Sequence, residues 1–102
     1  MPQYAYYPRG AQLSAAITTN TTTTINAGSG AIFSGLSVGT AGTAWNVAVY
    51  NGVPGSGGVL LATIPANTVG VVASPDLACP AGLYIVTTGT TPGSVTIAYY
   101  AS

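Results

Sequence analysis

Residues 45–52 read Trp-Asn-Val-Ala-Val-Tyr-Asn-Gly, and this stretch decides the fold class. Trp45, Val47 and Val49 share one parity, a period of two that is typical of a half-buried β-strand. Asn51-Gly52 then ends the strand, because this pair favours a turn. The parity of Trp45 places its side chain in the core. The alternative is that Trp45 is an exposed platform on which a carbohydrate stacks.

The same alternation recurs on both sides of this strand. Its apolar members are Leu13, Ala15 and Ile17; Ile32, Leu36 and Val38; Leu60, Ala62 and Ile64; Val69 and Val71; Leu83 and Ile85; and Val95, Ile97 and Tyr99. No window shows an apolar stripe of period 3.6, and 14 glycines disfavour helix. The pattern predicts an all-β protein of about eight short antiparallel strands, in a β-sandwich or jelly-roll-like fold.

Turn residues separate the expected strands. They lie at 51–58, Pro65-Ala66-Asn67, Ser74-Pro75-Asp76, Pro80-Ala81-Gly82 and Thr91-Pro92-Gly93. A weak internal echo links residues 39–50 with residues 89–100, since each runs from Gly-Thr to a final Tyr. The echo predicts two hairpins of strand, tight turn and strand. The alternative is that any two segments rich in Gly and Thr look alike.

Charged side chains are almost missing from the 102 residues. They make up 2% of the chain, against about 25% in an average soluble domain. Arg9 and Asp76 are the two, and there is no histidine. General acid–base catalysis, metal binding and binding to a nucleic-acid backbone each need several such groups. We therefore expect no enzyme, no cofactor, no metal and no nucleic-acid partner, and we expect Cys79 to be a small buried residue.

A net charge of zero favours association between molecules. The sequence therefore predicts a chain whose surface is largely covered by partners, with a homo-oligomer expected. No apolar run reaches the length of a membrane helix, and the first residues lack the basic start of a signal peptide. We expect no membrane partner and no export.

Residues 1–12 differ from the single β-sandwich domain that we expect over residues 13–102. Prolines at positions 2 and 8 fix an extended backbone, and tyrosines crowd between them. Tyrosine is common at interfaces because it combines an apolar ring with a hydroxyl. This segment is predicted to be an extended aromatic arm, or else the first edge strand. The partner contacts expected in the arm are Tyr4, Tyr6, Tyr7 and Arg9, although Arg9 could equally be solvated.

The two adjacent tyrosines of the last expected strand must point to opposite faces. Tyr99 and Tyr100 therefore cannot both fill the core, and Tyr100 is predicted to contact a partner. Asn20-Thr21-Thr22 matches the N-glycosylation pattern, which we interpret as coincidence. The threonine run over residues 21–24 fits a solvated strand edge or loop better than a regular ice-binding array.

Several short motifs resemble the small decoration, or cement, proteins of tailed bacteriophage capsids. They are Gly35-Leu36-Ser37-Val38-Gly39-Thr40-Ala41-Gly42-Thr43, the Val-Tyr-Asn-Gly at 49–52, Leu61-Ala62-Thr63-Ile64, Gly82-Leu83-Tyr84-Ile85-Val86, Gly89-Thr90 and Ser94-Val95-Thr96-Ile97-Ala98-Tyr99-Tyr100. The resemblance covers residues 32–100 and leaves out the arm. The scarcity of charge goes further in this chain than in that family.

The resemblance implies a β-sandwich or jelly roll, often trimeric, on the outside of a capsid at junctions between capsomers. It implies no catalytic residues. The expected function is therefore a structural virion protein that binds the major capsid protein, after synthesis in the host cytoplasm. The alternatives are another virion component, such as a tail, neck or fibre subunit, and a carbohydrate-binding module that uses Trp45 and exposed tyrosines.

Overall fold

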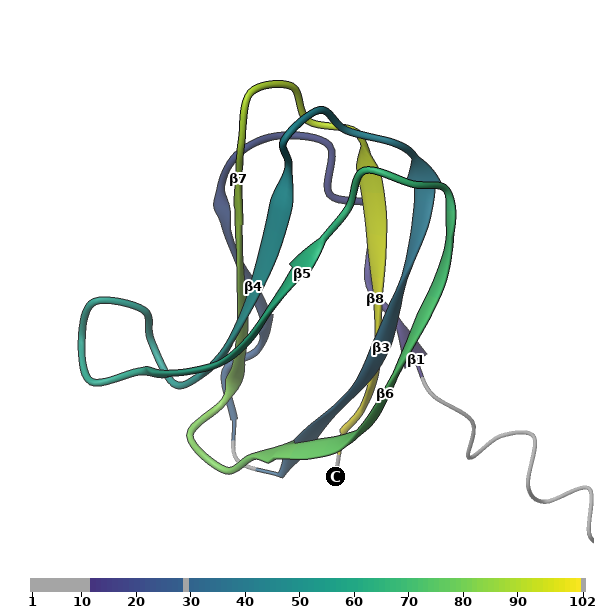
Figure 1. Cartoon of the computed structure of the whole chain (residues 1–102). Helices are drawn as coiled ribbons and strands as arrows, with labels where there is room; N and C mark the ends of the chain where they lie inside the picture. The colour runs from purple at the N-terminus through teal and green to yellow at the C-terminus, as the bar shows by residue number, and fades with distance from the viewer. Residues whose placement is uncertain (1–11, 29, 102) are drawn as a thin grey trace, which may run out of the picture.

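The computed structural model describes residues 12–28 and 30–101, which form two antiparallel β-sheets and no helix (Figure 1). The predicted all-β fold class is confirmed. In the described part of the chain the strands are β1 (Gln12–Leu13), β2 (Thr22–Asn26), β3 (Ala31–Thr40), β4 (Asn46–Asn51), β5 (Val59–Pro65), β6 (Gly70–Cys79), β7 (Leu83–Thr88) and β8 (Ser94–Tyr100). The predicted arm, except Gln12, lies outside the described residues.

The strand order is that of a jelly roll. Sheet A has the order β1-β8-β3-β6, and sheet B has the order β2-β7-β4-β5. Strand β1 pairs with β8, β2 with β7, β3 with β6 and β4 with β5. The chain thus pairs as one long hairpin whose two halves roll together into two sheets, which is how a jelly roll closes around a core.

Consecutive strands mostly lie in different sheets. Only the β4–β5 connection joins neighbours of one sheet among the described strands. The two hairpins predicted from the internal echo are therefore wrong, because the β3–β4 and β7–β8 connections each cross between the sheets. The two crossings instead lie side by side, since Thr43 and Thr91 exchange backbone hydrogen bonds of 2.9 and 3.1 Å.

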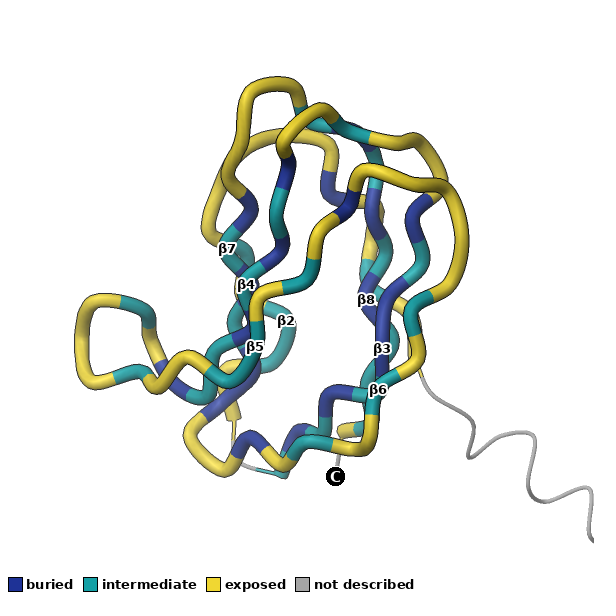
Figure 2. The backbone as a smooth tube through the Cα atoms, in the orientation of Figure 1, coloured by how far each residue is buried: buried dark blue, intermediate teal, exposed yellow. Residues whose placement is uncertain are grey.

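The buried positions, dark blue in Figure 2, recur along the strands of both sheets, and their side chains form one core cluster. Trp45 has no exposed surface, which confirms the core placement and removes the carbohydrate platform. Full burial of a large apolar side chain is worth about 1.5–3 kcal/mol. Cys79 is buried as predicted. The apolar core residues are Ile17, Ala31, Phe33, Leu36, Val38, Trp45, Val47, Val49, Ala66, Cys79, Leu83, Ile85, Val95 and Ile97.

A β-bulge at Gly35 changes the parity of β3. The register of β3 against both neighbours shifts between Phe33 and Gly35. Phe33 before the bulge and Leu36 after it therefore both face the core, although their positions differ in parity. The expected inward set of Ile32 with Leu36 and Val38 is wrong at Ile32, which pairs with Tyr100 on the outer face.

Strand β6 runs through the predicted turn at Ser74-Pro75-Asp76. This turn prediction is wrong because β6 is the outer strand of sheet A, where a proline needs no ladder partner. A register shift between Phe33 and Gly35 of β3 accommodates the extra residues of β6 at this point. The other four predicted turns lie at or between strand ends.

Five apolar residues that the alternation grouped with the core are exposed. They are Leu13, Ala15, Leu60, Val69 and Val71. In β6 the half-buried Val72 packs against the core instead of Val71. Alternation shows that a strand has two faces, but it does not show which face a neighbouring sheet covers.

Candidate interaction site

The tyrosine pair at the end of β8 divides as expected. Tyr99 packs against the core and pairs with Phe33, whereas Tyr100 pairs with Ile32 on the outer face of sheet A. Tyr100 is half-buried there, so part of its ring remains available for contact. Its predicted partner contact stays a prediction. The other predicted contact residues, Tyr4, Tyr6, Tyr7 and Arg9, lie outside the described residues.

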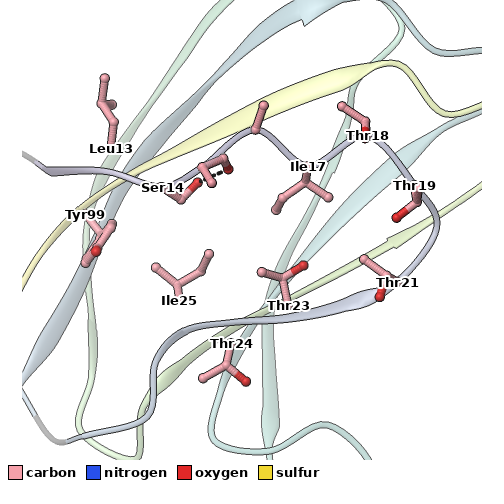
Figure 3. Close-up of a pocket in the computed structure, with 12 residues that line it drawn as sticks. Leu13, Ser14, Ile17, Thr18, Thr19, Thr21, Thr23, Thr24, Ile25 and Tyr99 are labelled. Carbon is pink, nitrogen blue, oxygen red and sulfur yellow. Dashed lines mark hydrogen bonds between the residues drawn. The ribbon is translucent and has the colours of Figure 1, made fainter.

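A cleft of about 420 Å³ lies between the segment that follows β1 and strand β2 (Figure 3). Ile17, Ile25 and Tyr99 give it apolar walls, and Thr18, Thr19, Thr21, Thr23 and Thr24 add hydroxyl and methyl groups. This is where the sandwich opens at its β1–β2 side, because β1 ends sheet A and β2 ends sheet B. None of the residues that line the cleft carries a charge, so they offer hydroxyl and apolar contacts and no ion pair.

Buried hydrogen bonds hold the connection beside this cleft. Thr87 of β7 has no exposed surface, and its hydroxyl donates to the Thr19 carbonyl oxygen at 2.7 Å. The same hydroxyl oxygen accepts the Thr21 amide at 3.1 Å. The backbone amide of Ile17 donates to the Val95 carbonyl oxygen at 2.8 Å. The connection is therefore tied to both sheets.

Asn20 links this connection to the core tryptophan. Its Oδ1 accepts the indole N–H of Trp45 at 2.8 Å, and its Nδ2 donates to the Gly89 carbonyl oxygen at 2.9 Å. Both ends of the carboxamide are thus used within the fold. This role accounts for Asn20 without a glycan, in agreement with the interpretation of Asn20-Thr21-Thr22 as a coincidental match.

A second hollow lies on the outer face of sheet A, and we call it the sheet-A depression. Its volume is about 280 Å³, and its lining is almost entirely apolar. It is lined by Leu13, Ser34, Gly35, Leu36, Ser37, Val71, Val72, Ala73 and Ala98.

The depression exists because large side chains flank small ones. Leu13, Ala98, Gly35 and Ala73 are successive cross-strand neighbours on β1, β8, β3 and β6. Gly35 has no side chain and each alanine contributes one methyl group, so the middle of this row is low. Leu13 is 67% exposed and Val71 is 79% exposed. The rims are therefore apolar and accessible.

The β4–β5 hairpin projects from the opposite side of the molecule (Figure 1). Its base is fixed, because Gly52 N–H donates to the Gly82 carbonyl oxygen and Asn51 Oδ1 accepts the Ala81 amide. Three apolar side chains at or next to this base are exposed, and we call them the hairpin knob. They are Val53 at 46%, Val59 at 57% and Leu60 at 51% exposure.

The described residues offer little titratable chemistry. Burial raises the pKa of the Cys79 thiol, although a backbone hydrogen bond from Phe33 partly opposes this effect. The raised pKa disfavours the reactive thiolate.

Residues 12–28 and 30–101 contain no cluster of His, Cys, Asp and Glu that could hold a metal ion. Over the same ranges no helix is long and apolar enough to cross a membrane.

Sequence reasoning missed both apolar surfaces. Leu13 and Val71 looked like core residues, and Val53 lay within a loop. One signal was present in the sequence: Val59 and Leu60 are adjacent, so two successive large side chains of one strand cannot both face inward.

The chain matches no family model, no curated protein and no solved structure in the comparisons.

Proposed function

We propose that this chain is a structural virion protein that decorates a bacteriophage capsid and stabilises it by bridging neighbouring major capsid subunits. In this proposal the chain acts as a homo-oligomer, with a trimer favoured, on the outer surface of the shell. It performs no catalysis and carries no cofactor. The proposal combines the motif resemblance over residues 32–100 with the surface properties of the described fold.

The observation that carries the proposal is the uncharged apolar surface of a rigid two-sheet body. Leu13 and Val71 are exposed at the sheet-A depression, and Leu60 is exposed at the hairpin knob on a different side of the molecule. Exposed apolar surface on several sides of a small domain is typical of contact with several neighbours. Asp76, the one charged residue in the described part of the chain, lines neither surface.

Decoration needs only modest contacts for each subunit. A specific interface buries ~800 Å² on each partner. When several linked copies engage a symmetric shell at once, their contacts gain strength through effective concentration. In the proposal the arm contacts a capsid subunit through Tyr4, Tyr6, Tyr7 and Arg9, and the jelly roll acts as a rigid spacer.

Binding to capsids that lack the chain tests the proposal. The purified chain is mixed with such capsids, and co-sedimentation measures occupancy. A variant without residues 2–10 is compared with one that keeps the arm length but replaces Tyr4, Tyr6 and Tyr7 with serine. Both variants are expected to lose occupancy while their thermal unfolding midpoint stays near that of the full chain.

Two results would count against this account. Undiminished occupancy of both variants would remove the role given to the arm. Failure of the full chain to bind any capsid would overturn decoration and favour another virion component, such as a tail, neck or fibre subunit.

A further inference from the structure

Strand β6 has the longest outer edge among the described strands. It contains ten residues, and of the described strands only β3 pairs with it. The other outermost strands, β1, β2 and β5, contain two, five and seven residues. An outer edge presents backbone N–H and C=O groups to which a strand of another chain can pair. Edge-to-edge pairing therefore threatens β6 more than any other described strand.

The first half of β6 has a sequence that favours such pairing. Residues 70–74 read Gly-Val-Val-Ala-Ser, with two adjacent valines and no charge. Val71 is 79% exposed, and Ala73 is exposed as well. Apolar, β-branched segments without charge or proline are typical starting points of pairing between chains. A net charge of zero supplies no general repulsion between copies, so any protection of this edge has to be local.

Three features that hinder strand addition coincide directly after this stretch. Ser74, Pro75 and Asp76 together oppose the single residue Ser34 of β3, so β6 bulges there. Pro75 has no backbone N–H, and its carbonyl oxygen already accepts the Ser74 hydroxyl at 2.7 Å. Asp76 is exposed, and it is the one charged residue in the described part of the chain. Bulges, prolines and charges are features by which natural proteins protect edge strands.

We propose that the bulge at Ser74-Pro75-Asp76 guards the outer edge of β6 against the addition of a strand from a second copy or from another protein. A strand laid along this edge would find no donor and an occupied acceptor at Pro75. It would also desolvate the Asp76 carboxylate, which is unfavourable without a cationic partner. The chain therefore associates through its side-chain surfaces and not by extension of sheet A. The guard goes beyond the proposed function, because it acts whether or not the chain binds a capsid.

Moving the charge away from β6 tests the guard. Asp76→Asn keeps the side-chain shape and leaves Arg9 as the only charge, so the net charge rises from 0 to +1. A second variant combines Asp76→Asn with Thr90→Asp, which returns the net charge to zero but places the carboxylate on an exposed loop. Asp76→Glu, which keeps the charge at the edge, is the matched control. A third variant combines Asp76→Asn with Pro75→Thr, which restores a backbone N–H.

Sedimentation velocity and light scattering over a concentration series detect species larger than the full chain forms. Asp76→Asn, alone and with Thr90→Asp, is expected to raise the association constant at least about tenfold, whereas Asp76→Glu should match the full chain. The variant with Pro75→Thr should associate most strongly. Net charge alone predicts the opposite for Asp76→Asn, because a chain of charge +1 repels its copies and a neutral chain does not.

Amide hydrogen exchange locates the new contact, and the amides of residues 70–79 are expected to exchange more slowly after association. Three results would overturn the inference. They are unchanged association in every variant, association that follows net charge, or slowed exchange only outside β6. The thermal unfolding midpoint of each variant is measured as well. Association that occurs only together with a lowered midpoint would assign the effect to unfolding and would also overturn the guard.

Discussion

Replacing Asn20 with alanine removes the oxygen that accepts the Trp45 indole N–H at 2.8 Å. Trp45 has no exposed surface, so its N–H has no direct route to bulk water. A buried donor left without a partner costs about 1–3 kcal/mol. Loss of the exposed bond to the Gly89 carbonyl oxygen adds about 0.5–1 kcal/mol, because water can replace that partner.

The expected loss is therefore about 1.5–4 kcal/mol in the free energy of unfolding. Each kcal/mol lowers the midpoint of thermal unfolding by roughly 4–8 °C in a domain of this size. Asn26→Ala is the matched control, since among the described residues Asn26 Oδ1 accepts a hydrogen bond only from the nearby amide of Gly28. The control is expected to cost about 0.5–1.5 kcal/mol.

A double-mutant cycle with Trp45→Phe separates the indole bond from everything else that Asn20 does. Phenylalanine has no side-chain N–H, so Asn20→Ala should cost only about 0.5–1 kcal/mol in that background. Denaturant unfolding followed by far-ultraviolet circular dichroism measures all four proteins, because Trp45→Phe removes the tryptophan fluorescence. An equal cost of Asn20→Ala in both backgrounds would refute the reasoning, since it would mean that the indole bond contributes nothing.

Three further predictions concern the strained backbone and the buried thiol. Gly35→Ala should lower the free energy of unfolding by about 1–3 kcal/mol or more in denaturant titrations, because the bulge holds φ at 148° and a Cβ there would lie 2.6 Å from the Val72 carbonyl oxygen. Ala44→Gly should be neutral or raise the free energy of unfolding by up to about 1 kcal/mol, because Ala44 has a φ of 47°, which glycine adopts without strain. The control Ala48→Gly, within β4, should lower it by about 0.5–1 kcal/mol. A higher melting temperature for Ala48→Gly than for Ala44→Gly would contradict this. The pKa of Cys79 is raised in the folded state, so its contribution to stability is complete below the ordinary thiol value of 9.0 and falls as the pH rises through that value. Cys79→Ala should flatten this alkaline fall in a pH series of unfolding free energies, and an unchanged slope would count against it.

The sequence predicted the elements of the fold better than their arrangement. Period-two alternation located the strands because it follows from backbone geometry, and the parity of Trp45, Val47 and Val49 placed all three in the core. The bulge at Gly35 was not visible, because one extra residue reverses parity without a distinctive pattern. Pro75 suggested a turn because the edge position of β6, which tolerates proline, depends on the whole topology.

The candidate surfaces depended even more on arrangement. Leu13 of β1 and Val71 of β6 are far apart in the sequence, and only the pairing of sheet A brings them to the same hollow. The bond from Trp45 to Asn20 also joins residues that no local pattern relates. By contrast, the scarcity of charged residues follows from the composition alone, and it favours partners that bind an uncharged surface.

Imaging of the virion tests the central claim most directly. Purified particles are examined by electron microscopy, once as produced by the complete phage and once from a phage whose gene for this chain is deleted. The account predicts repeated density on the outer shell at junctions between capsomers, which disappears from the deleted particles and returns when purified chain is added. Density confined to the tail or neck, or shells that are identical with and without the chain, would contradict it.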